Sequence, residues 1–519
     1  MTVRLSLANL PALARHARVP TYDRAGLAAG IVHIGVGNFH RAHQAAYLDA
    51  LFAQGCDHDW ALVGAGVRPE DADMRRDLAA QDHLTTVVEQ EAERSSARIV
   101  GSMIDFLPVG DAPAIVARMA DPSIRIVSLT ITEGGYFIDP ATQRFDAAHP
   151  DIRADAAALA DAARAAGGAD ALAPATAGGT QADAHVPRVV TAFGLIVAAL
   201  IRRRAAGVPP FTVMSCDNLP GNGEMAENAV AGLAGLVDPA LARWIRASVA
   251  FPNAMVDRIT PATADRERAI VADTYGIVDA RPVFCEAFVQ WVLEDRFSCG
   301  RPALDKVGVQ FVSDVRPFEL MKIRILNGGH AAIAYPAALM GVHFVHEAME
   351  HPLVRGFLAR VLDDEIVPCV PPVPDTDLGA YKALVERRFA NPAIGDTIRR
   401  LCLDGSNRQP KFILPSVASR LERGLPIDGL ALVGAFWCRY CYGETDDGTP
   451  IAPNDPNWPR LNATAVAARR DPAAWLAMSD IFGALGTNAT YATAFAAALE
   501  RVWRDGTRAT LVRYLAAAA

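Results

Sequence analysis

The stretch that decides the fold is Ile31-Val-His-Ile-Gly35-Val-Gly37-Asn38-Phe39-His40-Arg41-Ala-His43. It is an apolar strand that runs into a glycine-marked turn, and the following Gln44-Ala-Ala-Tyr-Leu-Asp-Ala-Leu-Phe continues with helical periodicity. A strand, a Gly-x-Gly turn and a helix begin a dinucleotide-binding fold, in which the pyrophosphate lies at the helix N-terminus. Because His40 replaces the third glycine of the usual pattern, a tight turn without a ligand is also compatible with it. In the cofactor interpretation, the expected contacts are Gly35, Gly37, Asn38 and Phe39.

A second apolar run favours the cofactor interpretation. It is Trp60-Ala-Leu-Val-Gly-Ala-Gly-Val67, and Arg68-Pro-Glu70-Asp71 follows it. An acid after the second strand of such a fold bonds the adenosine ribose hydroxyls and repels a 2′-phosphate. Glu70 and Asp71 lie further from the glycines than the usual ~20 residues. They predict NAD as the cofactor, while the neighbouring Arg68 keeps NADP open.

Three further strand-like runs end in polar loops marked by Gly or Pro. These runs are 124–132, 211–216 and 248–251, and the loops after them carry Glu133, Asn218 and Asp257. Ligands of an open α/β sheet bind outside the carboxyl ends of its strands, so these three residues are candidate site residues. Taken alone, each is better explained as a turn or helix-capping residue. The Ala-rich segment at about 155–185 predicts an inserted surface helix and loop without a chemical role.

The second half of the chain, from Cys285 onward, has mostly helical patterns. It contains Glu319-Leu-Met-Lys322-Ile-Arg-Ile-Leu-Asn327-Gly-Gly-His330. In an α-helix, at ~100° per residue, the four polar residues fall within an arc of about 140°. Buried polar groups cost stability unless they are partnered, so this face predicts either a structural salt bridge with capping residues or an active site.

Two arginines further along are candidate substrate-binding residues. Arg400 and Arg408 flank Asp404-Gly-Ser-Asn, and two guanidiniums near such a loop could clamp hydroxyls or a carboxylate. Surface salt bridges are the alternative explanation for each of them.

Length and composition limit the class of protein. A chain of 519 residues is too long for one core, so we expect an α/β dinucleotide-binding domain at 1–284 and a mostly α-helical domain at 285–519. The net charge of −8, without a basic run, argues against a nucleic-acid partner. The apolar runs are too short to span a membrane, and the start is not a secretory signal. Eight scattered cysteines are typical of reduced thiols in a cytoplasmic protein.

The sequence predicts no metal site. Cys438-Arg-Tyr-Cys441 has the CxxC spacing, but a second such pair is missing and the apolar run before it predicts a core helix. The cluster His343-Phe-Val-His346 lacks the carboxylate placement of a zinc-protease motif, which favours a surface or capping role.

Taken together, these stretches resemble the polyol-specific long-chain dehydrogenases. This is the mannitol 2-dehydrogenase family, which also contains arabinitol dehydrogenase and the fructuronate and tagaturonate reductases. The matching pieces run through most of the chain: 35–43, 130–136, 215–223, 251–261, 285–301, 322–330 and 404–406. The pattern K-x-x-x-x-N-x-x-H, here Lys322, Asn327 and His330, is specific to this family.

The resemblance implies a Rossmann-type N-terminal domain, a mostly helical C-terminal domain, NAD or NADP as cofactor, no metal and a monomer. It implies that Lys322 is the general base, that Asn218 and Asn327 hold the reacting oxygen, and that His330 binds substrate. Arg400 and Arg408 fall where the family places basic substrate-binding residues, although relatives often have lysine at the latter position.

The expected reaction is the interconversion of D-mannitol and D-fructose with transfer of a hydride. Lysine titrates near ~10.4 when free, so Lys322 needs burial to become partly neutral. Glu319 and Glu133 are expected to relay protons from it to water. Two alternatives stay open at this point: a hexuronate reductase in which Arg400 and Arg408 bind the substrate carboxylate, and a regulatory protein that binds NAD without turnover.

Overall fold

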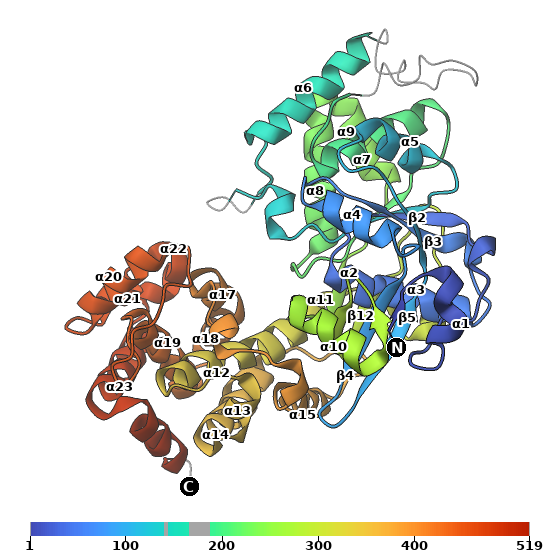
Figure 1. The fold of residues 1–519 in the computed structure, drawn as a ribbon. Coiled ribbons are helices and arrows are strands. Elements are labelled where there is room, and N and C mark those ends of the chain that lie inside the picture. The colour runs from blue at the N-terminus through green and yellow to red at the C-terminus, as the bar shows by residue number, and fades with distance from the viewer. Residues whose placement is uncertain (1, 140–143, 166–186, 518–519) are drawn as a thin grey trace. The chain divides into compact units, whose positions relative to one another are not determined.

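The structure is a computed structural model that describes residues 2–139, 144–165 and 187–517. The chain divides into two compact units, Met1–Val315 and Arg316–Ala519 (Figure 1). The expected division after residue 284 falls inside the first unit, because the strands that follow it pair with strands of that unit.

A five-stranded parallel sheet is the centre of the first unit. Its strands are β2 (Ala29–Ile34), β3 (Ala61–Ala65), β6 (Met103–Phe106), β7 (Ile126–Leu129) and β8 (Thr212–Ser215). Their spatial order is β6-β3-β2-β7-β8, so the chain moves outward to one side of β2 and then returns to its other side. This is the order of a Rossmann-type sheet, and the expected α/β fold is confirmed.

Helices cover both faces of this sheet, which explains why its strands are almost continuously apolar. On one face, Val32 and Ile34 pack against a cluster formed by α5 (Ala112–Ala120), α6 (Pro150–Ala165), α7 (Ala192–Ala205), α8 (Asn222–Val237) and α9 (Pro239–Ser248). On the other face, Ile31 packs against α3 (Gln44–Ala53). Alternate side chains of β2 therefore pack into two different hydrophobic cores, and neither face of the strand is exposed to solvent.

The Ala-rich segment is helical where it is described. Helix α6 buries Ile152 and Leu159 on the sheet side, and the Asp155 carboxylate accepts hydrogen bonds from the backbone N–H groups of Val190 and Thr191 at 2.8 and 3.0 Å. The predicted helix is thus present and is fixed to the start of α7. The loop predicted at 166–185 lies outside the described residues.

Two sequence-based expectations near the end of the first unit are wrong. Residues 248–251 form no strand, because α9 continues to Ser248, and the strand is β9 (Ala254–Asp257). The stretch after Cys285 is not helical: β11 (Val283–Glu286) pairs with β4 (Thr85–Gln90), which pairs with β5 (Ser95–Val100), and β12 (Gln290–Glu294) lies between β9 and β13 (Gln310–Val312). Trp291, Val292 and Leu293 are fully buried. A short run that is apolar on both sides shows no hydrophobic periodicity by which a strand could be told from a helix.

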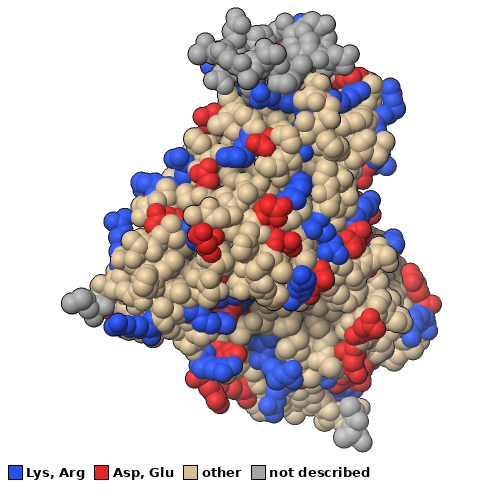
Figure 2. Space-filling view, turned by 90° about the vertical axis from the view of Figure 1, so that its right-hand side faces the viewer, with Lys and Arg blue, Asp and Glu red and all other residues tan. Residues whose placement is uncertain are grey.

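The second unit is mostly helical, as predicted. Its longer helices are α12 (Gly328–Leu339), α14 (Pro352–Arg360), α15 (Leu378–Phe389), α17 (Gly405–Phe412), α18 (Leu414–Glu422), α19 (Asp428–Cys441), α20 (Trp458–Ala468) and α23 (Ala489–Ala516). Cys438 and Cys441 are buried in α19, which confirms the predicted core helix. None of the described helices has the length and apolar character that a membrane crossing needs. On the face drawn in Figure 2, basic and acidic side chains are interspersed.

Candidate active site

The turn after β2 requires glycine at one position and leaves space at another. Gly35 has φ +96°, and a Cβ added there would lie 2.1 Å from the carbonyl oxygen of Thr130. Only glycine combines this backbone angle with so close an approach. At Gly37, by contrast, the nearest atom to an added Cβ is the Gly35 oxygen at 3.9 Å. The backbone at Gly37 is therefore open to a ligand.

A cavity of about 660 Å³ lies beside this turn. Its lining includes Gly35, Gly37, Arg68, Glu70, Asp71, Thr130, Thr132 and Arg281. All of these except Arg281 follow β2, β3 or β7, so the cavity lies outside the carboxyl ends of the strands, where the strand order reverses and ligands of such sheets bind. The volume is within the roughly 300–1,000 Å³ of small-molecule sites.

Four of the six predicted cofactor residues line this cavity, and two do not. Asn38 instead donates hydrogen bonds from its side-chain amide to the Pro261 oxygen at 3.2 Å and to the Thr263 hydroxyl at 3.1 Å. The ring of Phe39 stacks on His43 at 4.7 Å. Both side chains fix the helix that follows the turn, α2 (Asn38–Ala42).

A buried histidine in β2 holds the glycine turn in place through hydrogen bonds. The ring nitrogens of His33 lie 2.8 Å from the Ser128 and Thr130 hydroxyls, and the Thr130 hydroxyl donates to the Gly35 oxygen at 2.6 Å. Burial lowers the pKa of His33 to about 3, so the ring is neutral at physiological pH. The sequence analysis missed this residue, although a histidine within an apolar strand was a visible signal.

Asp217 positions the loop that carries Asn218. Its carboxylate accepts hydrogen bonds from the backbone N–H groups of Ile131 and Thr132 at 3.1 and 2.8 Å and from the Tyr136 hydroxyl at 2.7 Å. Thr132 has φ +63°, an outlier for a β-branched residue, and such strain persists only where the surroundings impose it. Burial raises the pKa of Asp217. Asp217 is not among the residues predicted from the sequence, although it lies two positions after the buried strand β8 (Thr212–Ser215).

Asn222 connects the same loop to β9 and so to Asp257. Its fully buried amide donates to the Asp217 and Ala254 oxygens at 2.9 and 2.8 Å and accepts from the Ala254 N–H at 2.9 Å. Asp257 is buried at the end of β9, while Asn218 and Glu133 are exposed. The three candidates thus follow strand ends, but β9 belongs to a separate sheet.

The helix with the polar quartet is not a continuous α-helix. It consists of α11 (Arg316–Met321), a π-helical turn (Lys322–Asn327) and α12. The expectation of one α-helical face through residues 319–330 is therefore wrong. Because a π-turn takes more residues per turn than an α-helix, Lys322 and Asn327 lie closer together around the helix axis than α-helical spacing would place them. Glu319 and Lys322 are buried, at 8% and 7% exposure. Single π-turns inside α-helices occur frequently at functional sites.

His330 lies in the first turn of α12 and stacks on Phe389, with ring centroids 4.0 Å apart. Its Nε2 is buried and has no hydrogen-bond partner among the described residues. Burial, followed by the positive charges of Arg400, Arg388 and Arg408, lowers the pKa of His330 well below its ordinary value. The imidazole is therefore neutral and has one nitrogen available to a ligand.

The two predicted substrate-binding arginines both have partners in the protein. Arg400 forms a two-pronged ion pair with the Asp396 carboxylate. Arg408 donates from Nη1 to the Arg400 and Leu401 oxygens, both at 3.3 Å. Their charges reach His330, but one of them is balanced by Asp396.

Within the described ranges, we find no group of three or more His, Cys, Asp or Glu residues that could hold a metal ion. The candidate residues of the first unit offer amide and carboxylate groups, and those of the second unit offer amine, amide, imidazole and carboxylate groups.

Comparison with known proteins gives full-length matches. The family model of the mannitol dehydrogenase Rossmann domain matches residues 29–306, and that of the mannitol dehydrogenase C-terminal domain matches residues 314–503. A mannitol 2-dehydrogenase from Cereibacter sphaeroides is 58% identical over 499 residues, covering 96% of this chain and 98% of the relative. One from Pyricularia oryzae is 42% identical over 503 residues, covering 96% and 95%.

Two solved structures are similar over almost the whole chain. The ternary complex of Pseudomonas fluorescens mannitol 2-dehydrogenase with NAD and D-mannitol has a TM-score of 0.84 at 42% identity, covering 99% of this chain and 100% of the other. A substrate-free D-sorbitol dehydrogenase has a TM-score of 0.85 at 32% identity, covering 98% and 100%.

Proposed function

Because the chain belongs to the mannitol dehydrogenase family, we propose that it is an NAD-dependent polyol dehydrogenase that oxidises D-mannitol to D-fructose and catalyses the reverse reduction. The observation that carries this proposal is the full-length similarity to mannitol 2-dehydrogenases, which covers both units. The retained lysine, asparagine and histidine of the family pattern argue against a regulatory protein without turnover, since a protein that only binds has no use for a base.

The first unit has a cradle that fits NAD. Open space beyond Gly37 suits a pyrophosphate, and Glu70 and Asp71 line the same cavity, where acids favour ribose hydroxyls over a 2′-phosphate. Asp71 is held in place, because its carboxylate accepts the backbone N–H of Arg68 at 3.0 Å. When bound, the cofactor supplies the hydride acceptor.

Residues of the chain would accept the proton of the substrate hydroxyl and stabilise the charge that develops on its oxygen. Lys322 is proposed to take the hydroxyl proton as general base, a role that requires it to be partly neutral. Asn218 and Asn327 would donate hydrogen bonds to the oxygen as it gains negative charge, and amides do this without adding charge. His330, which is neutral and stacked on Phe389, would bind a substrate hydroxyl through Nε2. Asp257 is proposed to accept from another hydroxyl.

Protons must then leave Lys322 for water. We assign this relay to Glu319, which lies buried one turn before the lysine, and to the exposed Glu133. A glutamate that exchanges protons, as opposed to one that pairs permanently with the lysine, leaves Lys322 free to lose its charge.

A neutral polyol fits the arginines better than a hexuronate does. The Asp396 carboxylate occupies the fork of Arg400, and Arg408 already donates from Nη1 to two backbone oxygens, so the two arginines do not offer a pair of uncommitted guanidinium forks to a substrate carboxylate. We therefore assign both arginines to hydroxyl binding and place the hexuronate reductase second.

The decisive experiment follows absorbance of reduced nicotinamide with NAD and then NADP, against mannitol, sorbitol, arabinitol, fructose and fructuronate. Turnover on mannitol and fructose with NAD, unchanged by a chelator, is the expected result. Activity confined to fructuronate would replace the proposal by the hexuronate reductase. Absence of turnover on all substrates, with cofactor still bound, would favour the regulatory alternative, and loss of activity with the chelator would contradict the metal-free mechanism.

A further inference from the structure

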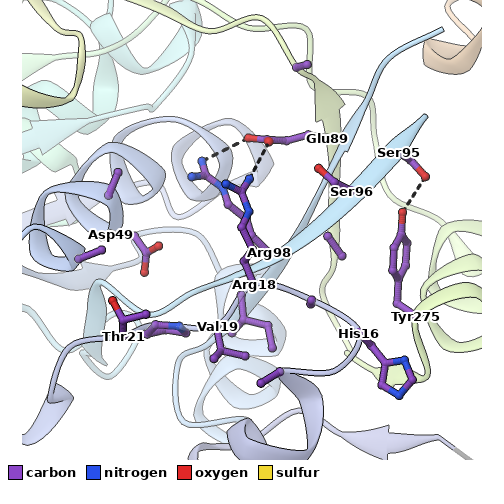
Figure 3. A pocket seen from close by; sticks show the side chains of 18 of the residues that line it. His16, Arg18, Val19, Thr21, Asp49, Glu89, Ser95, Ser96, Arg98 and Tyr275 are labelled. Carbon is purple, nitrogen blue, oxygen red and sulfur yellow. Dashed lines mark hydrogen bonds and ion pairs between the residues drawn. The ribbon is translucent and has the colours of Figure 1, made fainter. Parts of the chain in front are cut away.

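A second, larger cavity of about 1070 Å³ opens in the first unit (Figure 3). It is formed by residues of segment 14–21, by β5 and by parts of α3 and β4, and it shares no lining residue with the cavity beside Gly35. Its volume is near the upper limit of about 1,000 Å³ for small-molecule sites. The proposed reaction gives this cavity no role.

Three guanidiniums converge on a single carboxylate at this cavity. Glu89 is 2.7 Å from Arg258, and 3.5 Å from both Arg18 and Arg98. The buried Arg258 forms the short bond, whereas the other two contacts are at the outer limit of hydrogen bonding. In Figure 3, the guanidiniums of Arg18 and Arg98 lie side by side beneath the carboxylate. Positive charge is thus in excess here.

The donors of these two arginines are only partly used. The Nε of Arg98 is buried and has no hydrogen-bond partner among the described residues, which is a cost that a ligand oxygen would relieve. The side chain of Arg18 is 71% exposed, so it can turn toward a ligand without disturbing the core. Two adjacent guanidiniums with free N–H groups match the oxygens of a phosphate.

The other acids of the cavity do not cancel this charge. Glu91 is paired with Arg94, which also lines the cavity. The carboxylate of Asp49 accepts the Tyr22 hydroxyl at 2.7 Å and the Gly101 N–H at 2.9 Å, and burial raises its pKa. Both acids are therefore occupied within the protein.

Hydroxyl groups line the rest of the cavity. Thr21 and Ser96 contribute two of them, and the Ser95 and Tyr275 hydroxyls form a pair at 2.6 Å (Figure 3). Such groups donate to and accept from the hydroxyls of a sugar. We propose that this cavity binds a small phosphate ester rich in hydroxyl groups, with its phosphate on Arg18 and Arg98.

The test is calorimetry with D-glucose 6-phosphate on the full chain, saturated with NAD so that the other anion cradle is filled, at constant ionic strength. We expect saturable binding that free glucose does not reproduce. Arg18→Glu, which changes an exposed side chain, should weaken it at least tenfold. Arg98→Gln should do the same. Arg246→Gln is the matched control, because this arginine pairs with Glu227 outside both cavities and should leave the affinity unchanged.

Three results would overturn the proposal: absence of saturable binding, equal affinity in wild type and Arg18→Glu, or displacement of the ester by mannitol. Binding of inorganic phosphate as tight as that of the ester would refute the assignment of the hydroxyl groups. Calorimetry does not depend on turnover, so these outcomes are separate from the test of the proposed reaction.

Discussion

The two glycines of the dinucleotide turn should respond to alanine in opposite ways. In Gly35→Ala, a residue with a Cβ must adopt φ +96° and come within 2.1 Å of the Thr130 oxygen. The backbone angle alone costs about 1–2 kcal/mol, and the clash forces β2 and β7 to shift, so we expect a total loss of about 2–4 kcal/mol of unfolding free energy. In Gly37→Ala, the angle φ −98° is allowed and nothing lies within 3.9 Å, so stability should stay the same or rise by up to about 1 kcal/mol.

The affinity for the cofactor should fall in Gly37→Ala, the variant whose stability is expected to be retained. The added methyl of Gly37→Ala would project into the space that we assign to the pyrophosphate, so the affinity for NADH should fall at least tenfold, or about 1.4 kcal/mol. Urea denaturation followed by circular dichroism gives the stabilities, and quenching of tryptophan fluorescence by NADH gives the affinities. Gly26→Ala is the control, because its added Cβ also meets nothing closer than 3.8 Å but lies outside the cavity lining. Wild-type NADH affinity in Gly37→Ala would refute the cofactor placement.

Three further predictions concern the base, the relay and pH. Lys322→Ala should bind NADH normally and lose roughly 10²–10⁴-fold in kcat. Lys382→Ala, which breaks ion pairs with Asp363 and Glu386, should keep its kcat. A near-normal kcat in Lys322→Ala would remove Lys322 from the role of base. Glu319→Gln combined with Glu133→Gln should lower kcat, and wild-type turnover would exclude the relay. The pKa of His33 is about 6.5 in the unfolded chain and about 3 in the folded chain. Below pH 6.5 the unfolded chain therefore binds a proton that the folded chain does not, which lowers the free energy of unfolding as the pH falls. At pH 5 this loss should be about 2 kcal/mol relative to pH 7. Urea denaturation at pH 7 and 5 measures this loss, and His33→Gln should remove it; an equal pH dependence in that variant would contradict the assignment.

The sequence predicted the parts of the fold that depend on local pattern. Apolar runs that end in glycine located β2 and β3, and the family resemblance implied a Rossmann-type domain, whose strand order only the structure shows. The predictions failed where a segment is apolar on both sides. Strand β12 is buried on both faces, so its sequence lacks the alternation of apolar and polar residues that distinguishes a strand from a helix. The strand at 254–257 was missed because the apolar residues 249–251, which directly follow α9, look like the end of a short strand, and the residues after Pro252 then look like a loop.

The residues that support the candidate site were harder to find than the candidates themselves. Asp217, Asn222 and His33 act by hydrogen bonds to backbone or hydroxyl groups far away in sequence, and only the fold brings those groups to them. A polar residue within an apolar strand is a usable signal, but the sequence does not say which partner satisfies it. Arg281, which lines the cavity beside Gly35, is a similar case, because it comes from a segment far from the glycine turn.

The π-turn gives a physical reason for the spacing of the family pattern. In an α-helix, Lys322 and Asn327 would be separated by about 140° around the axis, because five steps of ~100° exceed one turn. In a π-turn each residue rotates the chain through a smaller angle than in an α-helix, so the amine and the amide lie closer to one line along the helix. The helix is α-helical again from Gly328, and the three-residue step from Asn327 to His330 is close to one α-helical turn. The spacing K-x-x-x-x-N-x-x-H, which spans a wide arc in a continuous α-helix, is therefore drawn closer to one side of the helix when a π-turn precedes the α-turn.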